Sequence, residues 1–202
     1  MWLVWLLLVI GSYLLGSIPT AYVIVKWRTG QDIRDIGSGN VGATNAVRAV
    51  GWYGYLAFVG DVLKGLLPVV AARALGGPEG AAAAGFCALM GHFFPIWLQF
   101  HGGKGVSTAF GVYLGLTPLL ALAGILFWAV LVLLSGYISL SSCAAVLLCP
   151  LLALAFHLPF ACYWLYMMMG VMITMRHSSN FRRLLQGNER RSKFYWRSLL
   201  NN

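Results

Sequence analysis

The sequence predicts an all-α integral membrane protein with about seven transmembrane helices, some of them short or broken. Of its 202 residues, 60% are hydrophobic and only 9% are charged, whereas soluble domains carry about 25% charged residues. The apolar residues also fall into long runs, several of which reach the roughly 20 residues that a helix needs to cross a bilayer. The length suits a single transmembrane domain over residues 1–202.

The first apolar run covers residues 2–25, and no basic residue precedes it. A secretory signal peptide has its positive charges before the apolar segment, whereas here Lys26 and Arg28 follow it. We therefore expect a retained first span whose N-terminus lies outside the cytoplasm. The next spans are expected at about residues 52–75 and 80–100, separated by a Gly-Gly-Pro-Glu turn.

Residues 106–134 are almost entirely apolar and too numerous for one straight span. Pro118 interrupts a helix and disfavours the helical conformation at the residue before it. We therefore expect a short helix over residues 106–116, followed by a full-length span; a short helix is tolerated at membrane depth where it lines a cavity. Two more spans are expected at about residues 137–157 and 158–175.

The basic residues predict the orientation of these spans. Of 14 Lys and Arg, four lie in residues 26–48 and seven in residues 176–197. Basic loops favour the cytoplasmic side, so both segments and the loop 101–104 are expected there, with the C-terminus inside. Seven crossings satisfy this condition; about five crossings with re-entrant segments also do, and we favour seven. The basic, aromatic tail of about residues 182–202 suits an interfacial segment on anionic lipid headgroups, the alternative being an unstructured positive tail.

Three polar motifs interrupt the apolar sequence. The first polar motif comprises residues 32–45 together with Arg48. Its glycines allow close backbone approach and left-handed conformations, and successive amides in such a loop cradle anions. Its hydroxyl and amide side chains add hydrogen-bonding groups, and its arginines suit phosphate; the alternative is a solvated turn. The candidate binding residues are Arg34, Gly37, Ser38, Gly39, Asn40, Gly42, Thr44, Asn45 and Arg48.

The second polar motif comprises residues 91–108 and contains a Gly-Gly-Lys-Gly sequence before an expected helix. The amides at a helix N-terminus and a nearby lysine favour anion binding, although the spacing differs from that of the nucleotide P-loop. His92 is either a binding residue or a hydrogen-bonded histidine of the membrane interior. The candidate residues are His92, Gly102, Gly103, Lys104, Gly105, Ser107 and Thr108.

The third polar motif comprises residues 176–189 and begins where the last expected span ends. His177 and Asn180 are three positions apart and would share one face of a helix. Glu189 lies among many basic residues, so a structural role in neutralising a neighbouring arginine is expected.

Asp61 and Lys64 lie inside the second expected span. Ionisable groups at membrane depth are costly, so they are usually paired or functional. Their spacing of three residues allows them to pair with each other. A structural pair is one interpretation, and participation of Lys64 in anion binding is the other.

These motifs, in this order, resemble those of the bacterial acyl-phosphate:glycerol-3-phosphate acyltransferase family, the PlsY family. The matching stretches are DIRDIGSGNVGATN at 32–45, GHFFPIWLQFHGGKGVST at 91–108 and RHSSNFRRLLQGNE at 176–189. The resemblance implies transfer of a fatty acyl group from acyl phosphate to the 1-hydroxyl of glycerol 3-phosphate, giving lysophosphatidic acid and phosphate. It also implies a seven-span fold in the bacterial inner membrane, with the site facing the cytoplasm.

By this resemblance, the glycine loop around Lys104 holds the headgroup of the acyl phosphate, and Glu189 is mainly structural. The residues expected to be catalytic are Ser38, Arg48, Lys104, His177 and Asn180. Because acyl phosphate is already activated, no covalent acyl-enzyme is required. The general base is either His177, since histidine titrates near neutrality, or a phosphate of the substrate.

No cofactor and no metal are expected, because the close acids Asp32 and Asp35 lie in a basic loop. The expected partners are the two phosphate substrates, the lipid bilayer and the enzyme that produces acyl phosphate; no nucleic acid is expected, and the protein is expected to act as a monomer. The principal alternative is a transporter for an organic phosphate, but the sequence has no duplicated halves. A phosphotransferase of the CDP-alcohol type would need several spaced aspartates, which this chain lacks, and an assembly factor would not need the glycine loop.

Overall fold

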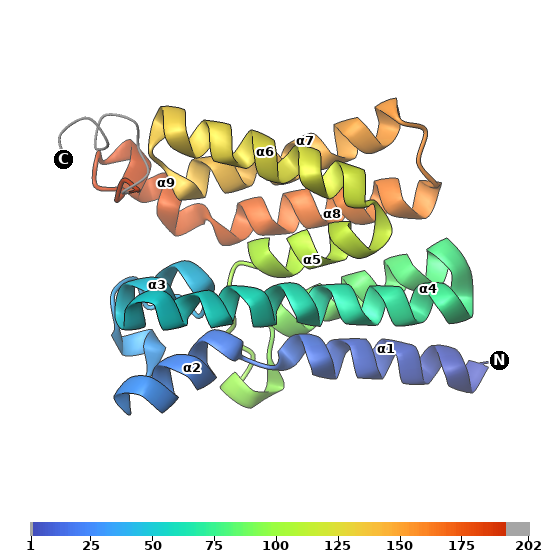
Figure 1. Ribbon diagram of the computed structural model, residues 1–202, viewed down its shortest axis with the longest axis horizontal. Helices are drawn as coiled ribbons and strands as arrows, with labels where there is room; N and C mark the ends of the chain where they lie inside the picture. Colours follow the sequence, from blue (N-terminus) through green and yellow to red (C-terminus); the bar gives the residue numbers. More distant parts are fainter. Residues whose placement is uncertain (1, 193–202) are drawn as a thin grey trace. The chain divides into compact units, whose positions relative to one another are not determined.

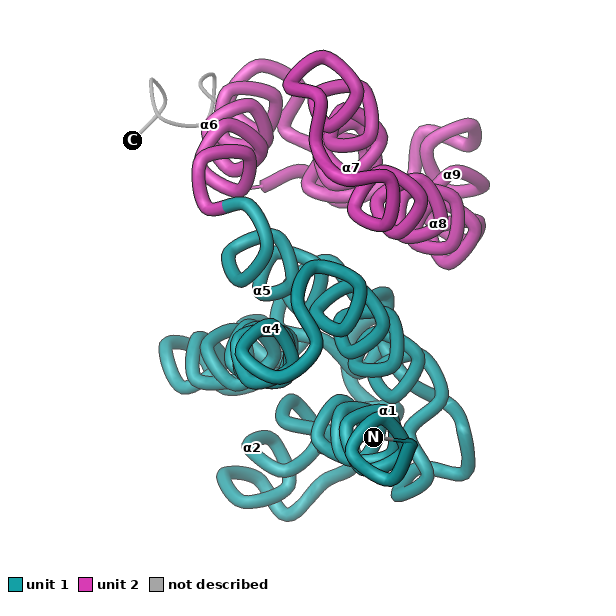
Figure 2. The backbone as a smooth tube through the Cα atoms, turned by 90° about the vertical axis from the view of Figure 1, so that its right-hand side faces the viewer, with its two compact units in different colours: residues 1–117 teal, residues 118–202 magenta. Residues whose placement is uncertain are grey.

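The computed structural model describes residues 2–192, and the secondary structure of this part of the chain is entirely helical. The chain forms two compact units, residues 1–117 and residues 118–202 (Figure 2). Figure 1 gives the order of the helices. The expected all-helical fold class is confirmed.

Unit 1 begins with two helices where the sequence predicted one span. Helix α1 (Trp2–Ser17) ends before Pro19, and α2 (Thr20–Thr29) follows it. Proline has no amide hydrogen and its ring clashes with the preceding turn, which explains the break. The expected first span is present, as a segment Trp2–Thr29 made of two helices rather than one, and the break leaves the Ile18 carbonyl available to a side chain of another helix.

Two short helical segments connect α2 to the next long helix. After the 3-10 turn η1 (Ile33–Asp35), helix α3 (Ala43–Val50) runs into η2 (Gly51–Tyr53). Helix α3 packs against both α2 and α4, and it buries Asn45 and Ala46.

Helix α4 (Gly54–Phe93) consists of two limbs joined at Gly76 and Gly77. Gly77 has φ 63° and ψ −158°, a conformation open to glycine, so the predicted turn is confirmed. Figure 1 shows the chain turning back at this point. The second limb ends at Phe93 rather than near residue 100, because Pro95 and the 3-10 turn η3 (Ile96–Leu98) interrupt it.

Glycines allow the helices of unit 1 to pack backbone against backbone. A Cβ atom at Gly16 of α1 would clash with the Ala88 carbonyl of α4, and one at Gly91 would clash with the Tyr13 carbonyl. Gly65 of α4 lies in the same way against the Thr108 carbonyl of α5. Small residues serve this purpose in membrane helices, where close packing replaces the hydrophobic effect.

The apolar segment 106–134 is divided as the sequence predicted. Helix α5 (Val106–Leu116) ends before Thr117, and α6 (Pro118–Ser135) begins at the proline. Arg73 of α4 donates from Nη1 to the carbonyls of Gly115 (3.3 Å) and Leu116 (3.2 Å). These carbonyls have no partner within the helix, so the arginine stabilises the end of the short helix.

Unit 2 contains α6, α7 (Ile138–Ala155), α8 (Phe160–Arg176) and α9 (Ser178–Leu185). Helix α7 packs against both α6 and α8, and Trp128 of α6 donates from Nε1 to Oγ of Ser142 (3.1 Å). The predicted interfacial tail begins within the amphipathic α9, where Leu185 is 90% exposed, and it stays a prediction. Residues 193–202 of that tail lie outside the described residues.

The helices establish an integral membrane protein. Among the described residues, four helical segments are long and apolar enough to cross a bilayer: Trp2–Thr29, Ala43–Leu98, Pro118–Ser135 and Ile138–Ala155. The second of these contains both limbs of α4. The total of seven crossings stays a prediction.

Candidate active site

The first polar motif is a loop held together from within by Asn45. The Asn45 side chain accepts from the Ser38 amide at Oδ1 (3.1 Å) and donates from Nδ2 to the carbonyls of Ile36 (2.9 Å) and Ile33 (3.3 Å). Gly37 and Gly39 have φ of 62° and 69°, which other residues rarely adopt. The buried Asn45 therefore shapes the loop.

This internal bracing places the other polar residues of the motif at the surface. Ser38, Thr44 and Arg48 are exposed, and Asn40 and Gly42 are half-buried. Arg48 lies in the last turn of α3. The hydroxyls and this guanidinium are thus accessible to a substrate, whereas the amide of Asn45 is used within the loop.

Arg34, a candidate phosphate ligand, forms an ion pair with Asp32. Its Nη2 lies 2.6 Å from Oδ2 of Asp32, and its Nε donates to Oδ1 (3.0 Å). Hydrogen bonding from the guanidinium lowers the pKa of the Asp32 carboxyl. The positive charge of Arg34 is therefore balanced locally by Asp32.

The glycine loop of the second polar motif is bonded to the end of α4. The Gly102 amide donates to the Phe93 carbonyl (3.1 Å), and the Gly103 amide donates to the His92 carbonyl (3.3 Å). These two amides are therefore engaged within the chain. The first amides of α5 have no partner inside their own helix, so they are the candidate donors to an anion at this loop.

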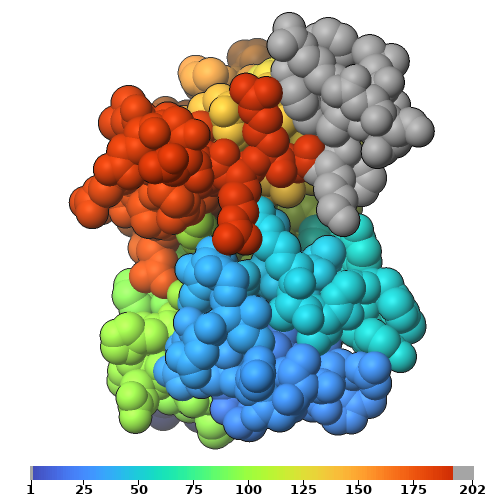
Figure 3. Space-filling view, turned by 90° about the vertical axis from the view of Figure 1, so that its left-hand side faces the viewer, coloured from blue at the N-terminus to red at the C-terminus, as the bar shows by residue number. Residues whose placement is uncertain are grey.

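The glycines of this loop are required by close packing. A Cβ atom at Gly102 would clash with the His92 carbonyl, and one at Gly103 would clash with the His92 ring and the Val41 carbonyl. Val41 belongs to the first polar motif, so the first and second motifs meet at Gly103. Figure 3 shows the blue-to-cyan surface of α2, the first motif and α3 beside the green surface of the second motif.

Lys104 follows these two glycines and is half-buried, and the left-handed Gly105 (φ 82°) leads from it into α5. Ser107 is half-buried in the first turn of α5. Thr108 is fully buried where α5 packs on Gly65 of α4. Lys104 and Ser107 therefore lie at the start of the helix, while Thr108 lies in a helix contact.

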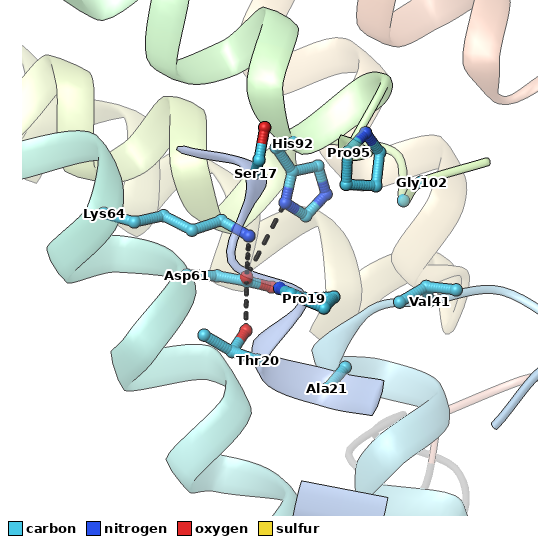
Figure 4. A pocket seen from close by; sticks show the side chains of 11 residues that line it. Ser17, Pro19, Thr20, Ala21, Val41, Asp61, Lys64, His92, Pro95 and Gly102 are labelled. Carbon is cyan, nitrogen blue, oxygen red and sulfur yellow. Dashed lines mark hydrogen bonds and ion pairs between the residues drawn. The ribbon is translucent and has the colours of Figure 1, made fainter. Parts of the chain in front are cut away.

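Near the glycine loop lies a polar group that we call the Asp61 cluster: Asp61, Lys64 and His92, which are buried, and Thr20, which is half-buried (Figure 4). Oδ1 of Asp61 lies 2.7 Å from Nζ of Lys64 and accepts from Oγ1 of Thr20 (2.6 Å). Nδ1 of His92 lies 3.6 Å from the same oxygen. The ion pair that the sequence predicted is present. Asp61 also contacts Thr20 of α2 and faces His92 on the second limb of α4.

A narrow pocket connects the Asp61 cluster with the glycine loop. It is lined by Ser17, Pro19, Thr20, Ala21, Val41, Asp61, Lys64, His92, Pro95, Gly102 and Gly103. Among these residues, Ser17, Thr20 and Val41 were not predicted from the sequence as site residues. The signal in the sequence for Ser17 and Thr20 was the Ser-Ile-Pro-Thr stretch at 17–20, which interrupts the first apolar run and was not used in the prediction.

In unit 2, His177 is buried at the junction of α8 and α9. Its Nδ1 lies 2.7 Å from the Ile173 carbonyl, which can only accept a hydrogen bond. Nδ1 therefore carries the hydrogen that is donated to this carbonyl. This tautomer fits either of the two roles considered for the histidine.

Glu189 organises the rest of the third polar motif. Its Oε1 accepts from Nδ2 of Asn180 (2.6 Å) and Oγ of Ser139 (2.7 Å), and its Oε2 accepts from Nε of Arg183 (2.7 Å). Burial by itself would raise the pKa of Glu189, but these hydrogen bonds outweigh it and lower the pKa. Ser139 was not predicted from the sequence; its hydrogen bond to Glu189 connects α7 to the segment that follows α9.

In the described part of the chain, no three His, Cys, Asp or Glu side chains gather in a way that would hold a metal ion. Metal independence stays a prediction, to be tested with a chelator.

The sequence of this chain matches the family model described as glycerol-3-phosphate acyltransferase over residues 6–187. The chain belongs to this family. A glycerol-3-phosphate acyltransferase of Moorella thermoacetica is 42% identical over 186 residues, which cover 92% of this chain and 96% of the relative. One from Nitrobacter winogradskyi is 46% identical over 183 residues, covering 89% and 92%.

Two solved structures are similar to this acyltransferase. The crystal structure of PlsY, an integral membrane glycerol 3-phosphate acyltransferase, in its glycerol 3-phosphate form has a TM-score of 0.90 at 40% identity, covering 93% of this chain and 95% of that one. PlsY in its lysophosphatidic acid form has a TM-score of 0.88 at 37% identity, covering 98% and 99%. The family that the three polar motifs predicted is confirmed.

Proposed function

We propose that this protein transfers a fatty acyl group from acyl phosphate to the 1-hydroxyl of glycerol 3-phosphate, releasing lysophosphatidic acid and phosphate. Acyl transfer to glycerol 3-phosphate follows from its family, and PlsY has been crystallised in a glycerol 3-phosphate form and a lysophosphatidic acid form. The observation that carries the proposal is the contact between the first and second polar motifs at Gly103. This contact brings the first polar motif, with its exposed Ser38, beside the glycine loop, which carries Lys104 and precedes α5.

The charges of these loops suit two phosphate substrates. Lys104 at the start of α5 and Arg48 on α3 are the cations that we assign to the substrate phosphates. Helix α5 adds its N-terminal amides, where the helix dipole favours an anion. Ser38 donates its hydroxyl hydrogen to one of the phosphates, and in unit 2 His177 and Asn180 serve the same reaction.

The reaction needs positioning and charge stabilisation rather than a covalent intermediate. The 1-hydroxyl oxygen attacks the acyl carbon, the bond between that carbon and the phosphate oxygen breaks, and phosphate leaves with the electron pair. Holding two substrates in register contributes about 7–11 kcal/mol, and cations at the leaving phosphate stabilise its developing charge. The hydroxyl proton passes to a substrate phosphate, while His177 orients that phosphate; neither a metal nor a cofactor takes part.

The protein lies in a bacterial inner membrane with its site on the cytoplasmic side, its N-terminus outside and its C-terminus inside. The basic segments support this orientation. The protein acts as a monomer and receives acyl phosphate from the enzyme that produces it.

The deciding experiment supplies palmitoyl phosphate and glycerol 3-phosphate to the purified protein in lipid, and measures released phosphate and lysophosphatidic acid. Equal amounts of both products, with none from palmitoyl-CoA, are expected. Lys104→Ala should abolish turnover, whereas Lys26→Ala, which removes an exposed lysine at the end of α2, should leave it unchanged. Absence of turnover by folded wild-type protein would refute the proposal, and flux of glycerol 3-phosphate into vesicles would then favour the transporter.

To separate the two roles of His177, we would compare His177→Gln with His177→Ala. A glutamine that retains much of the activity across pH supports an orienting role, because it donates a hydrogen bond but does not act as a base near neutral pH. Equal inactivity of both variants at every pH would instead assign the proton transfer to His177.

A further inference from the structure

We infer that the Asp61 cluster positions the glycine loop, and through it Lys104, for the acyl transfer proposed above. The inference rests on that proposed function. In it, Asp61, Lys64 and His92 touch neither substrate; they act on the reaction by holding Gly102 and Gly103. Of the two roles that the sequence left open for Lys64 and His92, the inference takes the structural one rather than direct substrate binding.

The cluster joins three helical segments that are distant in sequence. Lys64, on the first limb of α4, donates to the Ile18 carbonyl (2.8 Å) at the break between α1 and α2. Thr20, at the start of α2, bonds to Asp61. His92, at the end of the second limb of α4, faces the same carboxylate.

The glycine loop rests directly on His92. The His92 carbonyl accepts from the Gly103 amide, and the His92 ring fills the space where a Gly103 side chain would lie. A rotation of this ring would therefore displace Gly103 or break its contact with Val41. Asp61 faces Nδ1 of the ring, while the edge with Nε2 faces Gly103. Lys104 is the next residue, so its position follows that of Gly103.

Stability alone does not explain the ion pair. The side chains of Asp61 and Lys64 are only 3% and 5% exposed. A buried pair loses so much hydration that apolar replacements of both partners are often neutral or stabilising. Ionisable groups at membrane depth are rare for the same reason and usually mark function. A positioning role explains why a costly buried ion pair lies next to the glycine loop, which carries the Lys104 side chain.

The test uses a double variant that removes both charges together, Asp61→Leu with Lys64→Met. Of the three polar partners that remain, two keep alternative bonds: the Ile18 carbonyl accepts from the Thr20 amide (3.0 Å), and Oγ1 of Thr20 lies 3.4 Å from the Ala57 carbonyl. The third, Nδ1 of His92, loses the carboxylate that it faces, which is the change under test. The double variant should therefore fold with a melting temperature close to that of the wild type. Ser12→Ala, which removes a buried hydroxyl bonded within α1, is the matched control.

We expect kcat of the double variant to fall by roughly 10–100-fold, because small displacements of catalytic groups have effects of this size. KM for both substrates should change by less than about three-fold, because Arg48 and the α5 amides keep their positions and a displaced Lys104 loses most where charge develops on the leaving phosphate in the transition state. Amide hydrogen exchange in peptides covering residues 94–105 should become faster, while Ser12→Ala changes neither readout. A folded double variant with wild-type kcat and wild-type exchange would overturn the inference.

Two substitutions of His92 test the same idea while Asp61 and Lys64 stay in place. In His92→Asn the amide nitrogen stands near the position of Nδ1 and can still face Asp61, whereas in His92→Gln it stands near that of Nε2. The asparagine variant should retain several-fold more kcat than the glutamine variant. Equal kcat in the two variants would contradict the role of Asp61 in orienting the ring. If wild-type protein shows no turnover, the proposed function fails, and the exchange measurement still tests the coupling of the cluster to the loop.

Discussion

Each unit contains one carboxylate that accepts hydrogen bonds from several side chains, but the two differ in how they are charged and buried. In unit 1, the Asp61 side chain is 3% exposed, and that of its partner Lys64 is almost as deeply buried, at 5%. Glu189 of unit 2 is 8% exposed, while its partner Arg183 is 37% exposed. The first pair is enclosed at membrane depth, and the second has one charge that water reaches.

This difference shows what each carboxylate contributes. At Asp61 both ions have lost their hydration, so each depends on the other. At Glu189 the neutral donors Asn180 and Ser139 share the carboxylate with an arginine that solvent partly stabilises. We therefore expect single substitutions at Asp61 to cost more stability than those at Glu189, and substitutions at the exposed pair of Asp32 and Arg34 to cost least.

The largest effect is expected for Asp61→Asn, which leaves Lys64 buried without its counter-ion. Breaking one side of such a pair costs about 3–5 kcal/mol of unfolding free energy. The measurement is thermal or denaturant unfolding in a fixed detergent. Asp35→Asn, at an exposed position of the first polar motif, is the control and should change stability by less than about 0.5 kcal/mol. An Asp61→Asn protein as stable as the Asp35→Asn control would contradict the claim that Lys64 depends on Asp61 as its counter-ion.

An intermediate effect is expected for Glu189→Gln. The glutamine oxygen can still accept from Asn180 or Ser139, but the charge-assisted bond to Arg183 is lost, at a cost of about 1.5–3 kcal/mol. Hydrogen exchange should become faster in peptides spanning residues 178–192 and stay unchanged in peptides of α4. A loss of stability larger than that of Asp61→Asn would reverse the comparison.

The same carboxylate predicts a pH dependence. The pKa of Glu189 in the folded protein lies below its ordinary value of 4.5. The unfolded state therefore binds the proton first as pH falls, so the stabilisation is present above about pH 4.5 and is lost as pH drops through the lowered pKa. Wild type and Glu189→Gln should thus converge in stability toward acid pH. A constant difference down to pH 3 would contradict this assignment.

The smallest effect is expected for Asp32→Asn. The ion pair with Arg34 is partly exposed, and such pairs contribute about 0–1 kcal/mol and weaken with salt. Unfolding at low and high salt is the measurement. A cost above about 2 kcal/mol at high salt would mean that this pair braces the first motif as strongly as Asn45 does.

The fold was predictable from sequence where one residue or one run of residues decides the conformation. The split at Thr117 and Pro118 and the turn at Gly76 and Gly77 depend on local backbone chemistry, and both were predicted. Pro19 has the same chemistry, but the short Ser-Ile-Pro-Thr interruption lies inside an apolar run of about the length of one span, so residues 2–25 were interpreted as a single span.

The family and the candidate catalytic residues also came from the sequence, because polar residues at membrane depth and between apolar spans stand out by composition. Several partners did not. Thr20 and Asp61 are 41 positions apart, and Ser139 and Glu189 are 50 apart. No periodicity relates such residues, and their pairing follows from how the helices pack.

The sequence by itself determined an all-helical membrane protein, the family to which it belongs, the pair of Asp61 and Lys64, and the residues of three polar motifs. Helix periodicity, proline and glycine chemistry and hydropathy act over a few residues, and each can be judged without a fold. The tertiary structure alone decided that Gly102 and Gly103 use their amides on the end of α4, and that His92 stands between Asp61 and the lysine loop. These contacts depend on helices that approach each other through glycines far apart in the chain, and only the packed structure specifies which backbones meet.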